Sequence, residues 1–357
     1  MTRASTQVAF ESLAVLYQRL LTNRDFEEMT RIGGASEIAE WLTHTWYRDD
    51  MRAASAFYAP PESIEVATGM HLLRTNESIL KMVPRHGRNL LLAYLAKWDI
   101  ENIELILAAK GLGRALEWVD PFLVTDRKTP VGIAGATIPH GTLRFLLEQQ
   151  SIESVATYLL PYGYGSVLLL HLEEYEATGD LGIFGAALRR HYYSRLQWAL
   201  RFVKGDEGSM REYVGAQITK SNMLVLMKAG EPGAGPTREA LSRHLLPGGF
   251  VGVDRFLDAY SSSDYEGLVS EFEPSLDLSD TLQRYRKSGD LTEFESEADK
   301  TIARRYLWRM VMRPFSVPYV FSFVLMVEQE RQNIRRIVCG RRYDMPTEYV
   351  TSILVMK

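Results

Sequence analysis

Residues 99–110, DIENIELILAAK, form a pattern that returns as residues 219–230, TKSNMLVLMKAG, and as residues 330–341, ERQNIRRIVCGR. Each copy places one apolar residue directly after its Asn, two more at four and five positions after it, and a small residue at seven. These offsets fall on one side of an α-helix, where the small residue lets another backbone approach closely. The pattern therefore predicts three similar packing helices, which are identified by Asn102, Asn222 and Asn333.

A second pattern precedes each copy. Asp25, Ser151 and Asp264 each stand where a helix N-cap would stand, with an acidic residue shortly after, in the first turn, where the helix dipole favours it. Gly179-Asp180-Leu181 is also matched by Gly289-Asp290-Leu291, and a Phe follows each at the same distance. Together these patterns predict three homologous units.

The spacing of the patterns sets the size of the units. Corresponding residues lie roughly 110 to 125 positions apart, which is too long for a solenoid repeat and suits a small helical domain. The Gly- and Pro-rich segments 130–141 and 246–249 separate the copies. We expect an all-α fold of three homologous helical domains, residues 1–138, 139–247 and 248–357.

Apolar periodicity predicts helices throughout, and alternating strand patterns are almost absent. In the first unit we expect helices at 63–83 and 88–97, followed by the Asn102 helix with Asp99 as its N-cap. In the second unit the expected helices are 141–150, 151–160, 166–178, 181–203, 209–218, 221–229 and 237–245.

Composition excludes several classes of protein. The net charge of -4 over 357 residues argues against a nucleic-acid partner, which normally meets a concentrated basic face. Cys339 is the single cysteine, so no intramolecular disulfide can form. The longest stretch without formal charge, Ser154–Leu172, is broken by Pro161, so we expect any membrane association to be peripheral.

A search for chemistry predicts no catalytic, cofactor or metal site. Segment 230–237 resembles a phosphate-binding loop, but Pro236 stands where that loop needs a Lys, so a helix end and a turn are favoured. His171 and Glu174 share a helix face without a third ligand. Asp49-Asp50 has no second acidic motif to complete a metal-dependent synthase site, and Cys339 has no His-based partner.

One basic stretch stays open to two interpretations. Lys300 is followed at helical spacing by four arginines. A solvated helix face is the default interpretation, and a docking surface for an acidic partner is the alternative. The four candidate contact residues are Arg304, Arg305, Arg309 and Arg313.

These residues and motifs resemble a known family. The threefold Asn helix, the Gly-Asp-Leu element, Pro247-Gly248-Gly249 and Pro314-Phe315-Ser316 are similar to the C subunit of the V/A-type ATPases, whose eukaryotic relative is the d subunit. The resemblance covers essentially the whole chain. The first unit departs from it, because Pro60-Pro61 stands near the place of Gly-Asp-Leu.

The resemblance implies a pseudo-threefold funnel on the cytoplasmic face of the cell membrane. Such a protein receives the central shaft of a rotary ATPase in its cavity, rests on the membrane proteolipid ring, and transmits torque for ion transport or ATP synthesis without catalysing either. No catalytic or cofactor residues are implied. A generic helical scaffold built by triplication is the alternative, and an all-helical enzyme is disfavoured.

Overall fold

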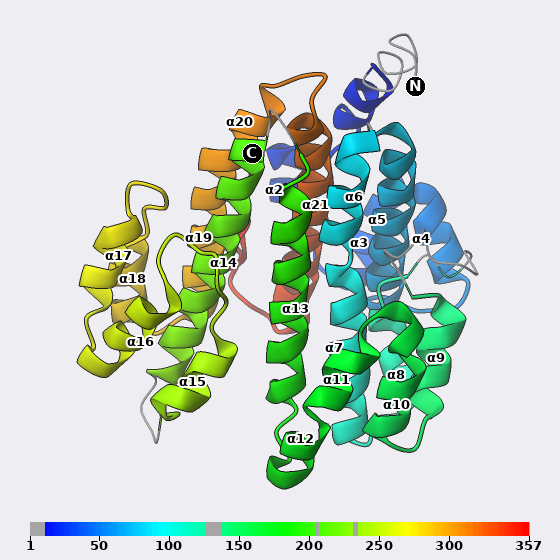
Figure 1. Ribbon diagram of the computed structural model, residues 1–357. Coiled ribbons are helices and arrows are strands. Elements are labelled where there is room, and N and C mark those ends of the chain that lie inside the picture. Colours follow the sequence, from blue (N-terminus) through cyan, green and yellow to red (C-terminus); the bar gives the residue numbers. More distant parts are fainter. Residues whose placement is uncertain are drawn as a thin grey trace. The chain divides into compact units, whose positions relative to one another are not determined.

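The chain forms an all-α protein, as the sequence predicted (Figure 1). A computed structural model describes residues 11–83, 85–125, 127, 138–203, 207–230 and 235–356. Over these residues the backbone forms α-helices, short 3₁₀ turns and one π-helical turn, and no strand.

The helices gather into two compact units. Unit 1 comprises residues 1–188 and 323–351, and unit 2 comprises residues 189–322 and 352–357. The boundaries fall inside two long helices, α13 (Gly182–Leu200) and α21 (Val317–Arg342). Packing defines these units, whereas sequence repetition defines the expected division at 138 and 247, so the threefold division stays a prediction.

Unit 1 is built around α5 (Glu62–Met82), which is buried along most of its length and contacts α4, α6 and η1. A helix that is buried on nearly all sides needs little amphipathic contrast, and the α5 sequence shows little. The other helices of unit 1 are α2 (Asn23–Met29), α3 (Ala35–Leu42), α4 (Arg48–Ser55), α6 (Arg85–Leu95), α7 (Lys97–Gly111), α8 (Leu116–Val119), η1 (Asp120–Phe122), α9 (His140–Glu148), α10 (Ile152–Tyr158), η2 (Leu160–Tyr162), α11 (Gly165–Leu170) and α12 (Leu172–Thr178).

The carboxylate of Glu330 ties the part of α21 in unit 1 to the N-terminal helices. Buried Glu330 accepts hydrogen bonds from the Leu21 amide at 2.6 Å, from Trp46 Nε1 at 2.7 Å and from the Tyr47 hydroxyl at 2.7 Å. Burial, with the nearby Glu330 charge, raises the pKa of Tyr47 well above its usual value, so the phenol stays a donor.

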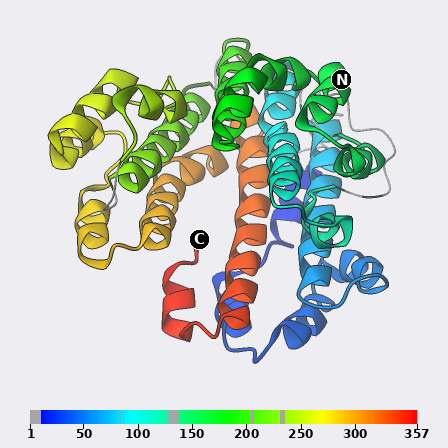
Figure 2. The same cartoon turned by 90° about the horizontal axis from the view of Figure 1, so that it is seen from below.

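In unit 2 the helices follow one another around α14 (Glu207–Ala229), and α19 returns to pack against α14 (Figure 2). Each helix from α14 to α19 contacts the next along the chain, which keeps most contacts local. These helices are α15 (Arg238–His244), α16 (Val253–Ser262), α17 (Tyr265–Phe272), α18 (Ser279–Ser288) and α19 (Leu291–Ile302), followed by η3 (Ala303–Leu307) and α20 (Trp308–Val311); the last helix of the chain, α22 (Thr347–Ser352), ends at the boundary between the units.

The two Gly-Asp-Leu elements adopt the same local structure. Gly179 and Gly289 end α12 and α18 in the left-handed conformation, with φ of 70° and 69°. Asp180 Oδ1 then accepts from the Gly182 amide at 2.8 Å, and Asp290 Oδ1 accepts from the Thr292 amide at 2.8 Å. Glycine tolerates positive φ and Asp caps the next helix, so the motif encodes one helix end and the start of the next.

Four local expectations were wrong. Segment 166–178 is not one helix, because α11 ends at Leu170 and α12 starts at Leu172, with His171 outside helical conformation between them. Asp25 is not an N-cap, because Thr22 caps α2 and Asp25 completes its capping box from the third helical position. Asp99 lies inside α7, where its buried carboxylate accepts from the Ile138 amide and the Tyr164 hydroxyl. The expected helices 209–218 and 221–229 are one helix, because packing against α19 and η3 outweighs the weak propensity of Thr219 and Ser221.

Candidate functional site

Asn102 holds a distant loop by a two-point backbone clamp. Its Nδ2 donates to the Val124 carbonyl at 2.9 Å, and the Val124 amide donates to its Oδ1 at 2.7 Å. Both residues are buried. A side-chain amide carries one donor group and one acceptor group, which match the C=O and N–H of a single residue, so Asn suits this position.

Asn222 makes the same clamp in unit 2. Its Nδ2 donates to the Leu246 carbonyl at 2.9 Å, and the Leu246 amide donates to its Oδ1 at 2.8 Å. The clamped residue follows the Asn by 24 positions here and by 22 in unit 1. Asn333 is buried on α21 and lies 3.4 Å from the Gln329 amide nitrogen. In these two clamps the repeated Asn therefore holds the backbone of a distant loop, at Val124 and at Leu246.

Unit 1 contains two neighbouring cavities beside α21, which together we call the α21 groove. The larger has a volume of about 330 Å³ and the smaller about 90 Å³. Phe122 and Arg335 line both. The larger is lined by Glu101, Asn102, Glu104, Leu105, Trp118, Phe122, Val124, Arg331 and Arg335; the smaller by Pro61, Glu62, Ile64, Glu65, Phe122, Arg335, Val338, Cys339 and Arg342.

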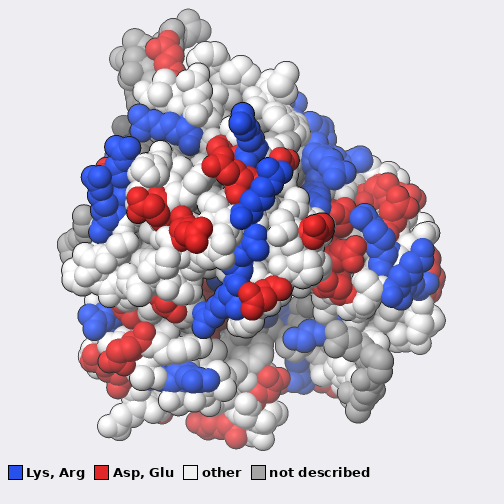
Figure 3. Space-filling view, turned by 180° about the vertical axis from the view of Figure 1, so that it is seen from behind, with Lys and Arg blue, Asp and Glu red and all other residues white. Residues whose placement is uncertain are grey.

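Charges of both signs line the groove. Glu65 pairs with Arg331 at 2.6 Å and with Arg335 at 3.1 Å. Burial lowers the pKa of Arg331, although the Glu65 charge opposes that effect. Desolvation by the surrounding protein raises the pKa of the Glu101 carboxyl, although the charge of Lys97 opposes this shift. The residue as a whole is nevertheless exposed. Figure 3 shows Lys and Arg intermixed with Asp and Glu on one face of the molecule.

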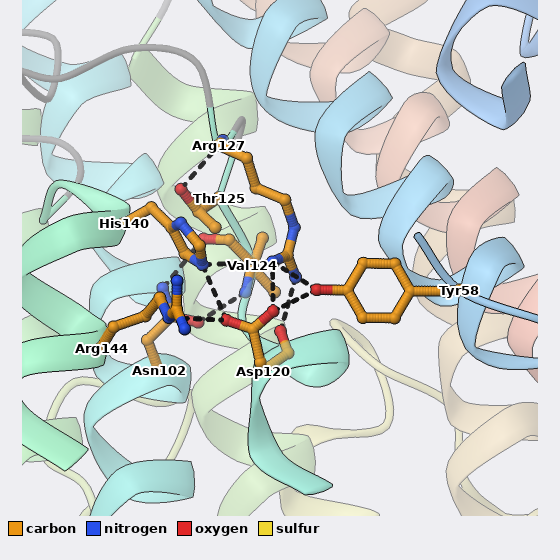
Figure 4. A network of polar contacts seen from close by, with 8 residues as sticks. All are labelled: Tyr58, Asn102, Asp120, Val124, Thr125, Arg127, His140 and Arg144. Atoms are coloured by element: carbon orange, nitrogen blue, oxygen red, sulfur yellow. Dashed lines mark hydrogen bonds and ion pairs between the residues drawn. The ribbon is translucent and has the colours of Figure 1, made fainter. Parts of the chain in front are cut away.

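A buried polar network around Asp120 lies close to the Asn102 clamp in sequence and in space (Figure 4). Arg127 Nη1 donates to the Asp120 carboxylate at 2.6 Å, His140 Nε2 lies 2.9 Å from it, and the Tyr58 hydroxyl also donates to it. Burial alone would raise the pKa of Asp120, but these hydrogen bonds and the Arg127 charge hold it well below its usual value.

This network is a structural anchor. Arg127 and His140 flank segment 128–137, which lies outside the described residues, and both are fixed by the same carboxylate. A charged side chain with several donors is stabilised where it is, and it offers no free proton site near neutral pH. Sequence reasoning missed Asp120, because its partners come from three separate elements.

The four candidate arginines are all exposed and lie on one continuous segment of unit 2. Arg304 and Arg305 belong to η3, Arg309 to α20, and Arg313 to the turn after it. Arg309 pairs with Glu212 at 2.7 Å, and Arg305 donates to the Pro274 carbonyl. Two of the four therefore bond to other parts of unit 2, and a contact of these arginines with a partner stays a prediction.

The other motifs singled out in the sequence form ion pairs within the protein or lie at helix ends. Asp50 is buried and pairs with His71 at 2.8 Å and with Arg74. His171 Nδ1 and Glu174 Oε2 lie 3.7 Å apart, but the expected shared helix face is absent, because His171 is the N-cap of α12 and not a helical residue. Gly230 ends α14 and Thr237 caps α15, whereas residues 231–234 between them lie outside the described residues.

Two searches over the described part of the chain were negative. It contains no group of three His, Cys, Asp or Glu side chains placed to hold a metal ion. None of its helices is both long enough and apolar enough to cross a bilayer.

Comparison with known proteins places the chain in a family. A sequence model described as ATP synthase (C/AC39) subunit matches residues 13–353. The C subunit of the A-type ATP synthase of Thermoplasma acidophilum is 33% identical over 97% of both chains. The proteins of the same name from Thermoplasma volcanium, 29% identical over 95% of both chains, and Methanocaldococcus jannaschii, 25% identical over 94% of this chain and 83% of its own, are also similar. The chain belongs to the ATP synthase (C/AC39) subunit family.

Proposed function

We propose that this chain is a non-catalytic central-stalk subunit of a rotary ATPase, which joins the rotating shaft to the membrane proteolipid ring and transmits torque between them. The observation that carries the proposal is the family match over residues 13–353, together with relatives that are named as the C subunit of A-type ATP synthases along almost their full length. The chain would lie on the cytoplasmic face of the membrane.

We also propose that three homologous helical domains, 1–138, 139–247 and 248–357, build this protein as a pseudo-threefold funnel. Two local structures support the repetition. The Asn clamp recurs at Asn102 and Asn222, and the glycine-ended helix with an Asp cap recurs at Gly179 and Gly289. Densely packed helices deform little under load, which suits a part that transmits torque.

The α21 groove is our candidate contact surface for the shaft. Trp118 stands half-exposed at its rim with Phe122 beside it, ring centroids 5.8 Å apart. Glu101 and Arg335 are exposed and carry opposite charges. An exposed aromatic group between charges of both signs is typical of protein interfaces, where Trp and Arg contribute most of the binding energy.

Coupling tests the proposed function. In cells that lack this chain, ATP hydrolysis should persist in the soluble fraction, whereas their membrane vesicles should lose ATP-driven ion transport. Adding the purified chain should restore transport. Transport that persists without the chain would contradict the proposal. So would turnover of a small molecule by the purified chain alone.

A matched pair of variants tests the groove. Trp118→Ala should weaken binding of the purified shaft subunits by about 30-fold, since truncation of a Trp at an interface centre costs about 2 kcal/mol or more. Phe145→Ala, which removes a similarly exposed aromatic side chain of unit 1 outside the groove, should bind normally. Equal affinities of the two variants, measured by calorimetry, would exclude the groove as the shaft contact.

A further inference from the structure

One end of unit 2 exposes large apolar side chains together with arginines. Met312 is 76% exposed and Phe315 63% exposed, in the turn after α20, and Trp308 stands on α20 itself. Trp198 and Phe202, at the end of α13, are also exposed and contact each other with ring centroids 4.6 Å apart. Exposed apolar side chains are ordinary when scattered, but a group of this size indicates a contact surface.

The two groups lie at the same end of unit 2. Arg309 on α20 pairs with Glu212 in the second turn of α14, at 2.7 Å. Phe202 precedes the first residue of α14 by only five positions, so the chain cannot carry it more than about 18 Å away. Figure 1 shows α20 and the start of α14 at the same end.

This end is basic in a chain that is acidic overall. The described residues of 195–203, 207–213 and 303–316 carry seven Lys and Arg against two Asp and Glu, a net charge of +5, whereas the whole chain has -4. Arg201 and Arg304 are exposed and have no ion-pair partner among the described residues. Such a concentration of positive charge attracts an anionic surface.

The turn at Phe315 carries a conformational cost. Phe315 is not a glycine, yet its φ is 66°. Ser316 holds the turn, since its Oγ donates to the Arg313 carbonyl at 2.6 Å and accepts from the Tyr319 amide at 3.3 Å. In the isolated protein both the backbone strain and the exposure of this large apolar side chain are unfavourable. Their combination indicates that Phe315 takes part in a contact with a partner.

We propose that this end of unit 2, which we call the Trp308 surface, binds the headgroup region of an anionic lipid bilayer. Its residues are Trp198, Arg201, Phe202, Arg304, Trp308, Met312, Arg313 and Phe315. Trp and Phe with interspersed Arg match the chemistry of that region, where aromatic rings lie at headgroup depth and arginines meet phosphate. A fluid interface also accommodates separate protruding side chains without a complementary partner shape.

This inference rests on the proposed function, which brings the chain to a membrane, and it adds a lipid partner to the protein partners proposed there. None of its residues lines the α21 groove, which is the contact surface proposed for the shaft. The two proposals can therefore fail separately: coupling is measured with the assembled complex, and lipid binding with the purified chain alone.

Vesicle binding tests the proposal. The purified chain should cosediment with phosphatidylcholine vesicles that contain phosphatidylglycerol and much more weakly with pure phosphatidylcholine, and added salt should weaken binding. Replacing Arg201 and Arg304 with Gln should lower the partition coefficient by about 25-fold, since each basic residue near an anionic surface contributes about fivefold.

The apolar part of the surface has its own variants. Trp308→Ser, Met312→Ser and Phe315→Ser together should lower the partition coefficient by about 100-fold or more, because they remove the apolar area that enters the interface. Phe57→Ser with Leu170→Ser is the control, since both side chains are at least 80% exposed in unit 1. All of these side chains are exposed, and circular dichroism checks that each variant folds.

A fluorescent probe locates the contact. Cys339 is the single cysteine, so Met312→Cys in a Cys339→Ser background takes one environment-sensitive label. Its emission should shift to the blue on anionic vesicles, whereas a label at Phe57→Cys should not shift. Three results would overturn the proposal. The first is no vesicle binding by the natural chain, and the second is full vesicle binding by the triple variant. The third is a triple variant that still binds vesicles but no longer binds the detergent-solubilised proteolipid ring.

Discussion

The two Asn clamps have the same geometry and different surroundings. In unit 1 the Asn102 clamp borders a cavity of about 330 Å³ that is lined by carboxylates and guanidinium groups. In unit 2 the Asn222 clamp is followed by a second bond, in which the Phe250 amide donates to the buried Thr219 hydroxyl at 2.9 Å. The Asn therefore holds a loop in the same way in both units, while the neighbouring residues differ: charged groups around a cavity in unit 1 and a second hydrogen bond in unit 2.

The apolar residue after each Asn should behave identically in both units. Ile103 and Met223 are both fully buried, so Ile103→Ala and Met223→Ala should each lower the free energy of unfolding by about 2–5 kcal/mol. Urea unfolding followed by circular dichroism measures the loss. A loss below about 1 kcal/mol in one variant would break the similarity of the two helices.

Removing the Asn clamp should destabilise the protein by a different amount in each unit. Asn222→Ala leaves the buried amide and carbonyl of Leu246 unpaired and should cost about 2–4 kcal/mol. Asn102→Ala should cost about 1–2 kcal/mol, because water in the adjoining cavity can bond to the Val124 groups. Equal losses would mean that the cavity does not hydrate the clamp, and hydrogen exchange at residues 124 and 246 reports each clamp separately.

The Asp120 network should make unit 1 sensitive to acid. Because the folded pKa lies below the unfolded value of about 3.9, its stabilisation is complete above that value and is lost as pH falls toward the folded pKa. Asp120→Asn should therefore cost about 1.5–3 kcal/mol at pH 7 and progressively less below about pH 4.

A neighbouring substitution provides the control for the acid effect. Val119 is fully buried beside Asp120 in the chain and does not titrate. Val119→Ala should lower the free energy of unfolding by an amount that stays constant from neutral to acidic pH. If the two variants showed the same dependence on pH, the Asp120 carboxylate would not be the acid-sensitive group.

The exposed arginines should contribute least to stability. Arg309 and Glu212 are about half exposed, so Arg309→Ala should change the free energy of unfolding by less than about 1 kcal/mol. The melting temperature measures this effect. A large destabilisation would make Arg309 a structural residue of unit 2 and weaken its assignment to a contact surface.

Much of the local structure was predictable. The helix expected at 181–203 is confirmed as α13, which starts one residue later and ends three residues earlier. Gly179 and Gly289, with positive φ, each end the helix before a Gly-Asp-Leu element. The α5 boundaries agree with the expected helix 63–83 to within one residue at each end. Asp99 was misplaced because an Asp before an apolar run has the same sequence signature whether it caps a helix or pairs with a distant amide, here that of Ile138.

The sequence by itself determined the helical class, the recurring Asn and Gly-Asp patterns and the basic stretch at 300–313, because these depend on periodicity, backbone conformation and charge along one segment. Only the tertiary structure decided that Asn102 clamps Val124, that Asp120 binds Tyr58, Arg127 and His140, and that Arg304, Trp308 and Met312 are left exposed. Such contacts join residues that are distant in the chain or set which face is left uncovered, and no local pattern encodes either.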